Sequence, residues 1–185
     1  IEAIAAVCPL RRVKVYARRT EKLAAFCARM SARLGIEVIA AVSPEDVVRG
    51  SDIVSTVTTS ATPLFNAEWL SPGTHVNAAG SNSLIRRELG EDVLKRCSPI
   101  VVDSVETALR EAGELLPWLE KGRLHARELL ELGKVICGRH AGRSTDDQIT
   151  LFESQGMAIQ DLAVAVHLEE LARELGVGIE LPYGS

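Results

Sequence analysis

The chain has 185 residues, and its 21 basic and 25 acidic side chains leave a net charge of −4. That length suits one domain, or one domain and part of another, and an apolar content of 46% is enough for a core and excludes a disordered chain. Mild acidity argues against nucleic acid, which is bound by a basic surface, and no apolar run approaches the roughly 20 residues that span a bilayer. We therefore expect neither nucleic acid nor a membrane as a partner.

The cysteine and histidine positions argue against a metal site or a disulfide framework. No cysteine pair has Cys-x-x-Cys spacing, and no two histidines lie four residues apart. The residues concerned are Cys8, Cys27, Cys97, Cys137, His75, His125, His140 and His167. A disulfide framework needs a denser pattern in a shorter chain. We expect free thiols, no metal and a cytoplasmic location.

Strand and helix patterns alternate over the first hundred residues. The opening stretch 1–8, ended by Pro9, reads as the last turns of a helix, which either starts the fold or continues from upstream. A helix is expected at 21–34 after a Thr20 cap, and another after Ser43-Pro44. Strands are expected at 13–17, 37–41, 53–58, 74–79 and 99–103.

After residue 104 the pattern becomes helical. Helices are predicted at 105–116, 125–137 and 154–175, the first interrupted at Gly113, with a polar loop at 142–147. Within the first of these, Glu111 and Glu114 are expected on a solvated helix face. The tail 177–181 could form a strand that returns elsewhere.

Strands that alternate with helices predict an α/β fold with a doubly wound parallel sheet of Rossmann type. Ligands of such sheets bind at the carboxyl ends of the strands, so the residues that follow each strand are the candidates. They are Arg18 and Arg19; Thr58, Thr59 and Ser60; Gly80, Ser81 and Asn82; and Ser104.

The sequence gives conflicting evidence on whether the chain binds a dinucleotide cofactor. In dinucleotide-binding folds an acid after the second strand bonds the ribose, whereas arginines accept the 2′-phosphate of NADP. Arg18 and Arg19 therefore favour NADP, although a solvated basic loop would look the same. The expected Gly-x-Gly-x-x-Gly turn is absent. Either the chain binds no dinucleotide, or that turn and the first strand lie upstream of Ile1.

Several strings in order resemble the ornithine cyclodeaminase/mu-crystallin family over essentially the whole chain. They include 15–22 (VYARRTEK), 49–54 (RGSDIV), 72–82 (PGTHVNAAGSN), 87–89 (REL), 102–104 (VDS), 110–115 (REAGEL), 142–144 (GRS), 150–154 (TLFES) and 156–161 (GMAIQD). Family members are longer at the N-terminus. The resemblance implies that residues 1–176 are an NAD(P)-binding domain without its first strand and glycine turn. It also implies that 177–185 return to a dimerisation and substrate domain that lies outside this chain.

The resemblance also implies site roles, position by position. Ala17, Arg18 and Arg19 match the segment at the adenosine ribose, and Thr58, Thr59 and Ser60 match the loop over the cofactor. Ala79 and Ser154 match residues near the nicotinamide. Asn82 stands where cyclodeaminases have a proposed acid/base aspartate, and Arg86 where they have a lysine; we treat these two as the catalytic candidates.

Asn82 is the informative departure from the family pattern, because an amide cannot titrate near neutral pH and so cannot act as a general base. This favours hydride transfer to a small cyclic imine or ketimine, or oxidation of the corresponding amino acid. The resemblance further implies a homodimer, and the expected cofactor is NADP or, alternatively, NAD. Cyclodeamination of ornithine and non-catalytic, NADP-dependent binding of a small molecule, as in mu-crystallin, stay open.

Overall fold

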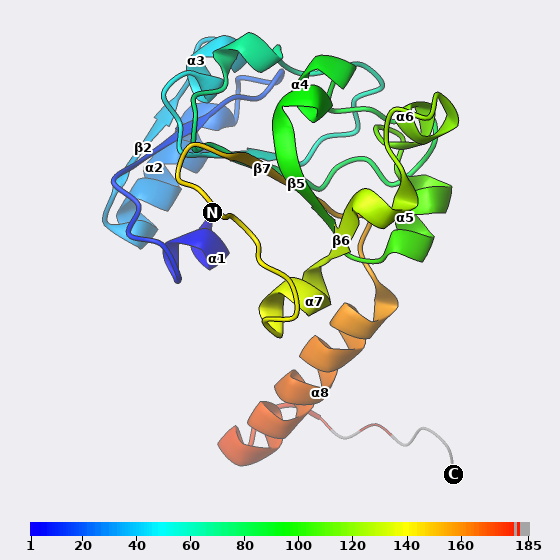
Figure 1. Cartoon of the computed structure of the whole chain (residues 1–185). Helices are drawn as coiled ribbons and strands as arrows, with labels where there is room; N and C mark the ends of the chain where they lie inside the picture. The colour runs from blue at the N-terminus through cyan, green and yellow to red at the C-terminus, as the bar shows by residue number, and fades with distance from the viewer. Residues whose placement is uncertain (180, 182–185) are drawn as a thin grey trace.

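The computed structural model describes residues 1–179 and 181, so the predicted tail strand at 177–181 lies partly outside the described residues. All strands pair in parallel (Figure 1). The strands are β1 (Arg12–Val15), β2 (Glu37–Ala40), β3 (Ile53–Thr56), β4 (His75–Ala78), β5 (Cys97–Val102), β6 (Leu129–Glu131) and β7 (Ile149–Glu153). This confirms the α/β prediction and a parallel sheet of Rossmann type.

The strands form two sheets. One pairs β1 with β2, and the other has the order β3-β4-β7-β5-β6. The helices are α1 (Glu2–Ala5), α2 (Leu23–Leu34), α3 (Pro44–Val48), α4 (Glu91–Arg96), α5 (Val105–Glu111), α6 (Leu116–Glu120), α7 (Leu132–Ile136) and α8 (Ala158–Leu175), with 3-10 turns at Ala67–Trp69 and Ala126–Glu128. Among the described residues, β1 and β3 each pair on one side only.

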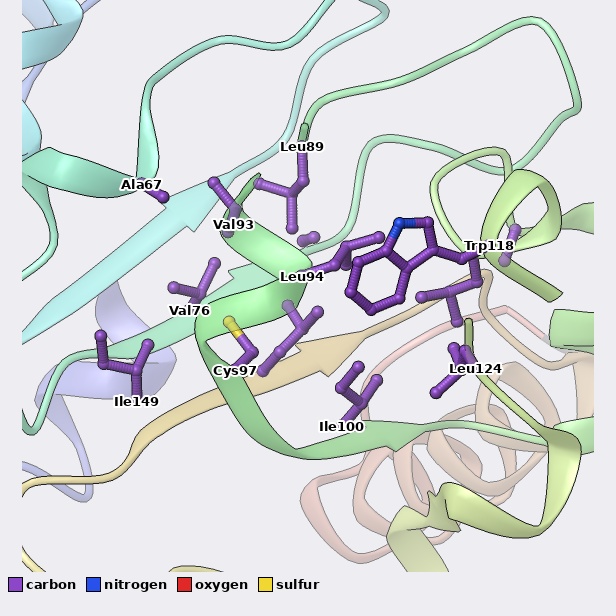
Figure 2. Packing of buried hydrophobic residues seen from close by; sticks show 14 of the residues in the cluster. Ala67, Val76, Leu89, Val93, Leu94, Cys97, Ile100, Trp118, Leu124 and Ile149 are labelled. Carbon is purple, nitrogen blue, oxygen red and sulfur yellow. The ribbon is translucent and has the colours of Figure 1, made fainter. Parts of the chain in front are cut away.

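Each sheet has its own hydrophobic core. The larger core lies on the five-stranded sheet, where Val76, Leu94 and Ile100 pack together with Trp118 in one cluster (Figure 2). The smaller core joins Leu23, Cys27 and Met30 of α2 to Val38 of β2. That stripe is the amphipathic face expected of this helix, which ends at Gly35 with φ of 68°.

Of the two helix starts predicted from the sequence, the structure confirms one and contradicts the other. Ser43 caps α3, since its Oγ accepts the Asp46 N–H at 3.1 Å. Thr20 does not cap α2, which begins at Leu23 after Lys22 and has no side-chain cap. The intervening residues form a turn, so the predicted helix is two residues too long at its N-terminus.

The helical prediction for the second half of the chain is partly wrong. The expected helix at 125–137 is a 3-10 turn, the edge strand β6 and the short helix α7. The helix at 105–116 splits into α5 and α6 around Gly113, and the last helix begins at Ala158 rather than Ser154. Strand β7 precedes it and lies in the middle of the large sheet, a place that no local periodicity indicates.

Candidate functional site

The carboxyl ends of β3, β4, β7 and β5 meet at one edge of the large sheet because these strands are parallel. Two backbone bonds show the register there. The Ala79 N–H donates to Thr56 O at 2.9 Å, and the Ser154 N–H donates to Ala78 O at 2.9 Å. Residues after β3, β4 and β7 therefore leave the sheet next to one another.

The loops that follow β3 and β4 are joined by backbone hydrogen bonds. Arg87 N–H donates to Ser60 O at 2.9 Å, and Leu64 N–H donates to Glu88 O at 2.8 Å. Thr58 and Thr59 are exposed at this edge, and Ala79 is exposed beside them. Three of the predicted cofactor contacts thus share one surface.

The two catalytic candidates touch each other. The Arg86 Nη1 donates to Asn82 Oδ1 at 3.0 Å, which closes the turn after β4. The same turn is held from inside by Ser81, which is buried and whose Oγ donates to Arg86 O at 2.9 Å. The Asn82 amide oxygen accepts from a guanidinium, and its NH2 group makes no hydrogen bond among the described residues, although Asn82 is exposed.

Ser154 is held by a buried carboxylate that follows β5. Its Oγ donates to Asp103 Oδ2 at 2.6 Å, and the same oxygen accepts the Gly156 N–H at 2.9 Å. Asp103 Oδ1 accepts from Gln160 of α8 at 3.0 Å. Asp103 therefore fixes both the Ser154 side chain and the start of α8, a role that sequence reasoning missed.

The structure does not bring Ala17, Arg18 and Arg19 into contact with the other candidates. They follow β1, in the smaller sheet. Both arginines are exposed, and neither forms an ion pair with any described residue. The guanidiniums are thus available to an anionic ligand, as the NADP interpretation requires.

Three buried glutamates behind the edge were not anticipated. Glu88, Glu114 and Glu153 are 0–2% exposed, which corrects the expected solvated position of Glu114; Glu111 is exposed as expected. Burial, together with the neighbouring Glu114 and Glu88 charges, raises the pKa of Glu153 well above its usual range. The β-branched and apolar residues of 149–152, directly before Glu153, were the available signal for a strand.

Among residues 1–179 and 181, no group of three or more His, Cys, Asp or Glu side chains could hold a metal ion. Within that same range, no helix has both the length and the apolar character needed to cross a bilayer.

A parallel sheet with polar loops gathered at its carboxyl edge defines a Rossmann-type α/β protein. Residues 1–175 match the model of the ornithine cyclodeaminase/mu-crystallin family, and the chain belongs to that family. It is 38% identical over 183 residues to a Delta(1)-pyrroline-2-carboxylate reductase of Bacillus cereus, covering 98% of this chain and 56% of the relative.

Two solved structures are similar to this chain in both fold and sequence. The Thermococcus litoralis Delta(1)-pyrroline-2-carboxylate reductase, in complex with NADH and L-proline, has a TM-score of 0.91 and 31% identity, covering 97% of this chain and 56% of that one. An archaeal alanine dehydrogenase dimer with bound NAD has a TM-score of 0.88 and 35% identity, covering 99% of this chain and 56% of that one. The chain thus spans about half the length of these relatives.

Proposed function

We propose that the complete protein is an NADP-preferring oxidoreductase that reduces the C=N bond of a small cyclic imine or ketimine, or oxidises the corresponding amino acid. The observation that carries the proposal is the Asn82–Arg86 pair at the carboxyl edge. It offers a cation and an amide for an anionic substrate, but no group that titrates near neutral pH. Imine reduction needs no protein base, since water can supply the proton.

We infer that candidate residues from both sheets would hold the dinucleotide. Arg18 and Arg19 would hold the 2′-phosphate, and Thr58, Thr59, Ser60, Ala79 and Ser154 would line the rest of the cofactor. When bound, the cofactor supplies the hydride. The solved relatives contain NADH or NAD. The preference for NADP rests on the two free guanidiniums, because arginine pairs bidentately with phosphate.

The two incomplete sheets suggest what the rest of the protein contributes. A strand between β1 and β3 would join them into one doubly wound sheet with a glycine turn for the pyrophosphate. We propose that this strand lies upstream, that 1–176 complete the cofactor domain, and that 177–185 return to a dimerisation and substrate domain. The enzyme would then act as a homodimer. Its free thiols suit the cytoplasm.

Purified complete protein tests this assignment. Oxidation of NADPH should follow addition of Δ1-pyrroline-2-carboxylate or Δ1-piperideine-2-carboxylate. Ammonia release from ornithine without net cofactor oxidation would instead make the protein a cyclodeaminase. Tight NADPH binding with neither reaction would favour the small-molecule binding function.

The cofactor preference is tested by the double variant Arg18→Ala/Arg19→Ala. A charge-assisted hydrogen bond is worth roughly 1.5–3 kcal/mol, so NADPH affinity should fall about tenfold or more while NADH affinity barely changes. Fluorescence titration with both cofactors measures this. An equal loss for the two cofactors would show that these arginines do not contact the 2′-phosphate.

A further inference from the structure

The Glu88 carboxylate links the loops after β3 and β4. Its Oε1 accepts the Thr58 N–H at 2.5 Å, and its Oε2 accepts the Gly80 N–H at 2.9 Å. Oε2 also accepts the Thr56 hydroxyl at 2.8 Å. The Glu88 side chain therefore holds the beginning of both loops from the buried side.

Because Glu88 is buried, its carboxylate oxygens need hydrogen-bond donors from the protein. Glu88 is completely buried, and no cation pairs with it among the described residues. A buried carboxylate is costly unless its oxygens are hydrogen-bonded, and here three donors satisfy them. Those donors all belong to the end of β3 and to the two loops, so the carboxylate is satisfied only while both loops keep this position.

The close approach of the two loops leaves no room for a side chain at Gly80. A Cβ at this position would overlap Thr58 O and Thr58 N, and would lie 2.5 Å from Glu88 Oε1. The Gly80 backbone thus lies directly against Thr58 and the carboxylate. A second buried acid supports Glu88 from behind, because Glu114 Oε1 accepts the Glu88 N–H at 2.6 Å.

We propose that Glu88 is a positioning residue that holds the loop 57–60 and the turn 79–82 in the one arrangement that receives the dinucleotide. The inference rests on the proposed function, since these loops carry Thr58, Ala79 and Asn82. Glu88 itself lies beneath the loops and touches neither cofactor nor substrate. Its removal would change how well the loops are ordered before binding rather than the chemistry that follows.

The test compares Glu88→Gln with Glu114→Gln in the complete protein. Both changes are isosteric and both remove a buried acid, but Glu114 accepts the Glu88 N–H and makes no hydrogen bond to residues 57–60 or 79–82 among the described residues. A glutamine at 88 cannot accept from all three donors. We expect the KM for the nicotinamide cofactor to rise about tenfold in Glu88→Gln, with kcat within about threefold of wild type. In Glu114→Gln the KM should stay within about twofold, even where the melting temperature falls.

Hydrogen exchange gives a readout independent of activity. The Thr58 and Gly80 amides should exchange at least about tenfold faster in Glu88→Gln, while the His75 amide, which donates to Asp52 O, should not change. Unchanged exchange at Thr58 and Gly80, or an equal KM increase in both variants, would overturn the positioning role. A wild-type protein that binds neither NADH nor NADPH would overturn the proposed function instead, and the exchange result would still decide whether Glu88 holds the loops.

Discussion

At the scale of single residues, the site depends on places where backbone passes very close to backbone. Gly80 lies against Thr58, and Gly113 lies against Ser83 and Arg86; a Cβ on Gly113 would overlap Arg86 O and lie 2.7 Å from Ser83 O. Both glycines bring the turn after β4 against its neighbours. They are needed for close approach rather than for an unusual φ.

Gly80→Ala should therefore destabilise the chain. The added methyl meets backbone atoms that cannot rotate away, and overpacking of this kind costs about 1–3 kcal/mol. Gly133→Ala in α7 is the matched control, because nothing lies within 4 Å of its Cβ, and there alanine should stabilise by about 0.5–1 kcal/mol. Urea denaturation measures both; equal stability of the two variants would contradict the close approach at Gly80.

The protonation of Glu153 should make stability depend on pH. Its pKa is raised in the folded state, so folding binds a proton that the unfolded chain has released above about pH 4.5. This stabilisation is fully present below the unfolded pKa and is lost as pH rises through the folded pKa, at up to about 1.4 kcal/mol per pH unit.

Glu153→Gln should flatten that decline, because an amide can donate to Glu114 at every pH. Denaturation curves from pH 5 to pH 8 for wild type, Glu153→Gln and the exposed control Glu111→Gln check this. A wild-type decline that persists unchanged in Glu153→Gln would assign the pH dependence to other groups.

At the scale of elements, α8 differs from the other long helix. α2 buries one apolar stripe, whereas every residue of α8 except Ala172 is exposed, and the helix projects from the body (Figure 1). Its apolar residues lie on more than one side; they include Ile159, Leu162, Val164, Val166, Leu168 and Leu171. Exposed apolar side chains on several sides of one helix mark a surface for contact with another protein segment, so we expect α8 to be covered in the complete protein.

The chain by itself should therefore self-associate through α8. Leu162→Gln/Leu168→Gln removes apolar surface without changing charge, and should shift sedimentation-velocity profiles towards the monomer. His167→Gln, a neighbouring exposed position on the same helix, should leave the profiles as in wild type. Equal self-association of the double variant and the wild type would show that a surface other than α8 mediates it.

At the scale of the whole molecule, the cofactor candidates are divided between two sheets. Arg18 and Arg19 follow β1, and the remaining candidates surround β3, β4 and β7. Lys14 of β1 does contact the end of α3, since its Nζ donates to Arg49 O at 2.9 Å. Among the described residues β1 and β3 are each unpaired on one side, and the sequence has no Gly-x-Gly-x-x-Gly turn whose backbone amides would bind a pyrophosphate between them.

We therefore expect the 185-residue chain alone to be inactive. NADPH titrated into it should show no micromolar binding, and cyclic imines should not be reduced, whereas the complete protein should do both. Micromolar binding and turnover by the 185-residue chain would mean that its phosphate site lies among its own residues, and the proposal of an upstream glycine turn would then be wrong.

Local sequence was sufficient for the features that depend on neighbours in the chain. The βα alternation predicted the parallel α/β class. Local signals predicted the start of α3 after Ser43 and the end of α2 at residue 34, because propensity and capping act within one or two turns. Placement of Thr58, Ala79 and Asn82 at one edge followed from the parallel direction of the strands.

Only the tertiary structure decided which short segments became strands and which acids were buried. β6 lies within a segment that was predicted as a helix, and β7 was not predicted; each forms because a neighbouring strand that is distant in the chain supplies its hydrogen bonds. Glu88, Glu114 and Glu153 look like surface residues in the sequence. They are buried because donors distant in the chain, such as the Thr58 and Gly80 amides, come within hydrogen-bonding distance only after the sheet has formed.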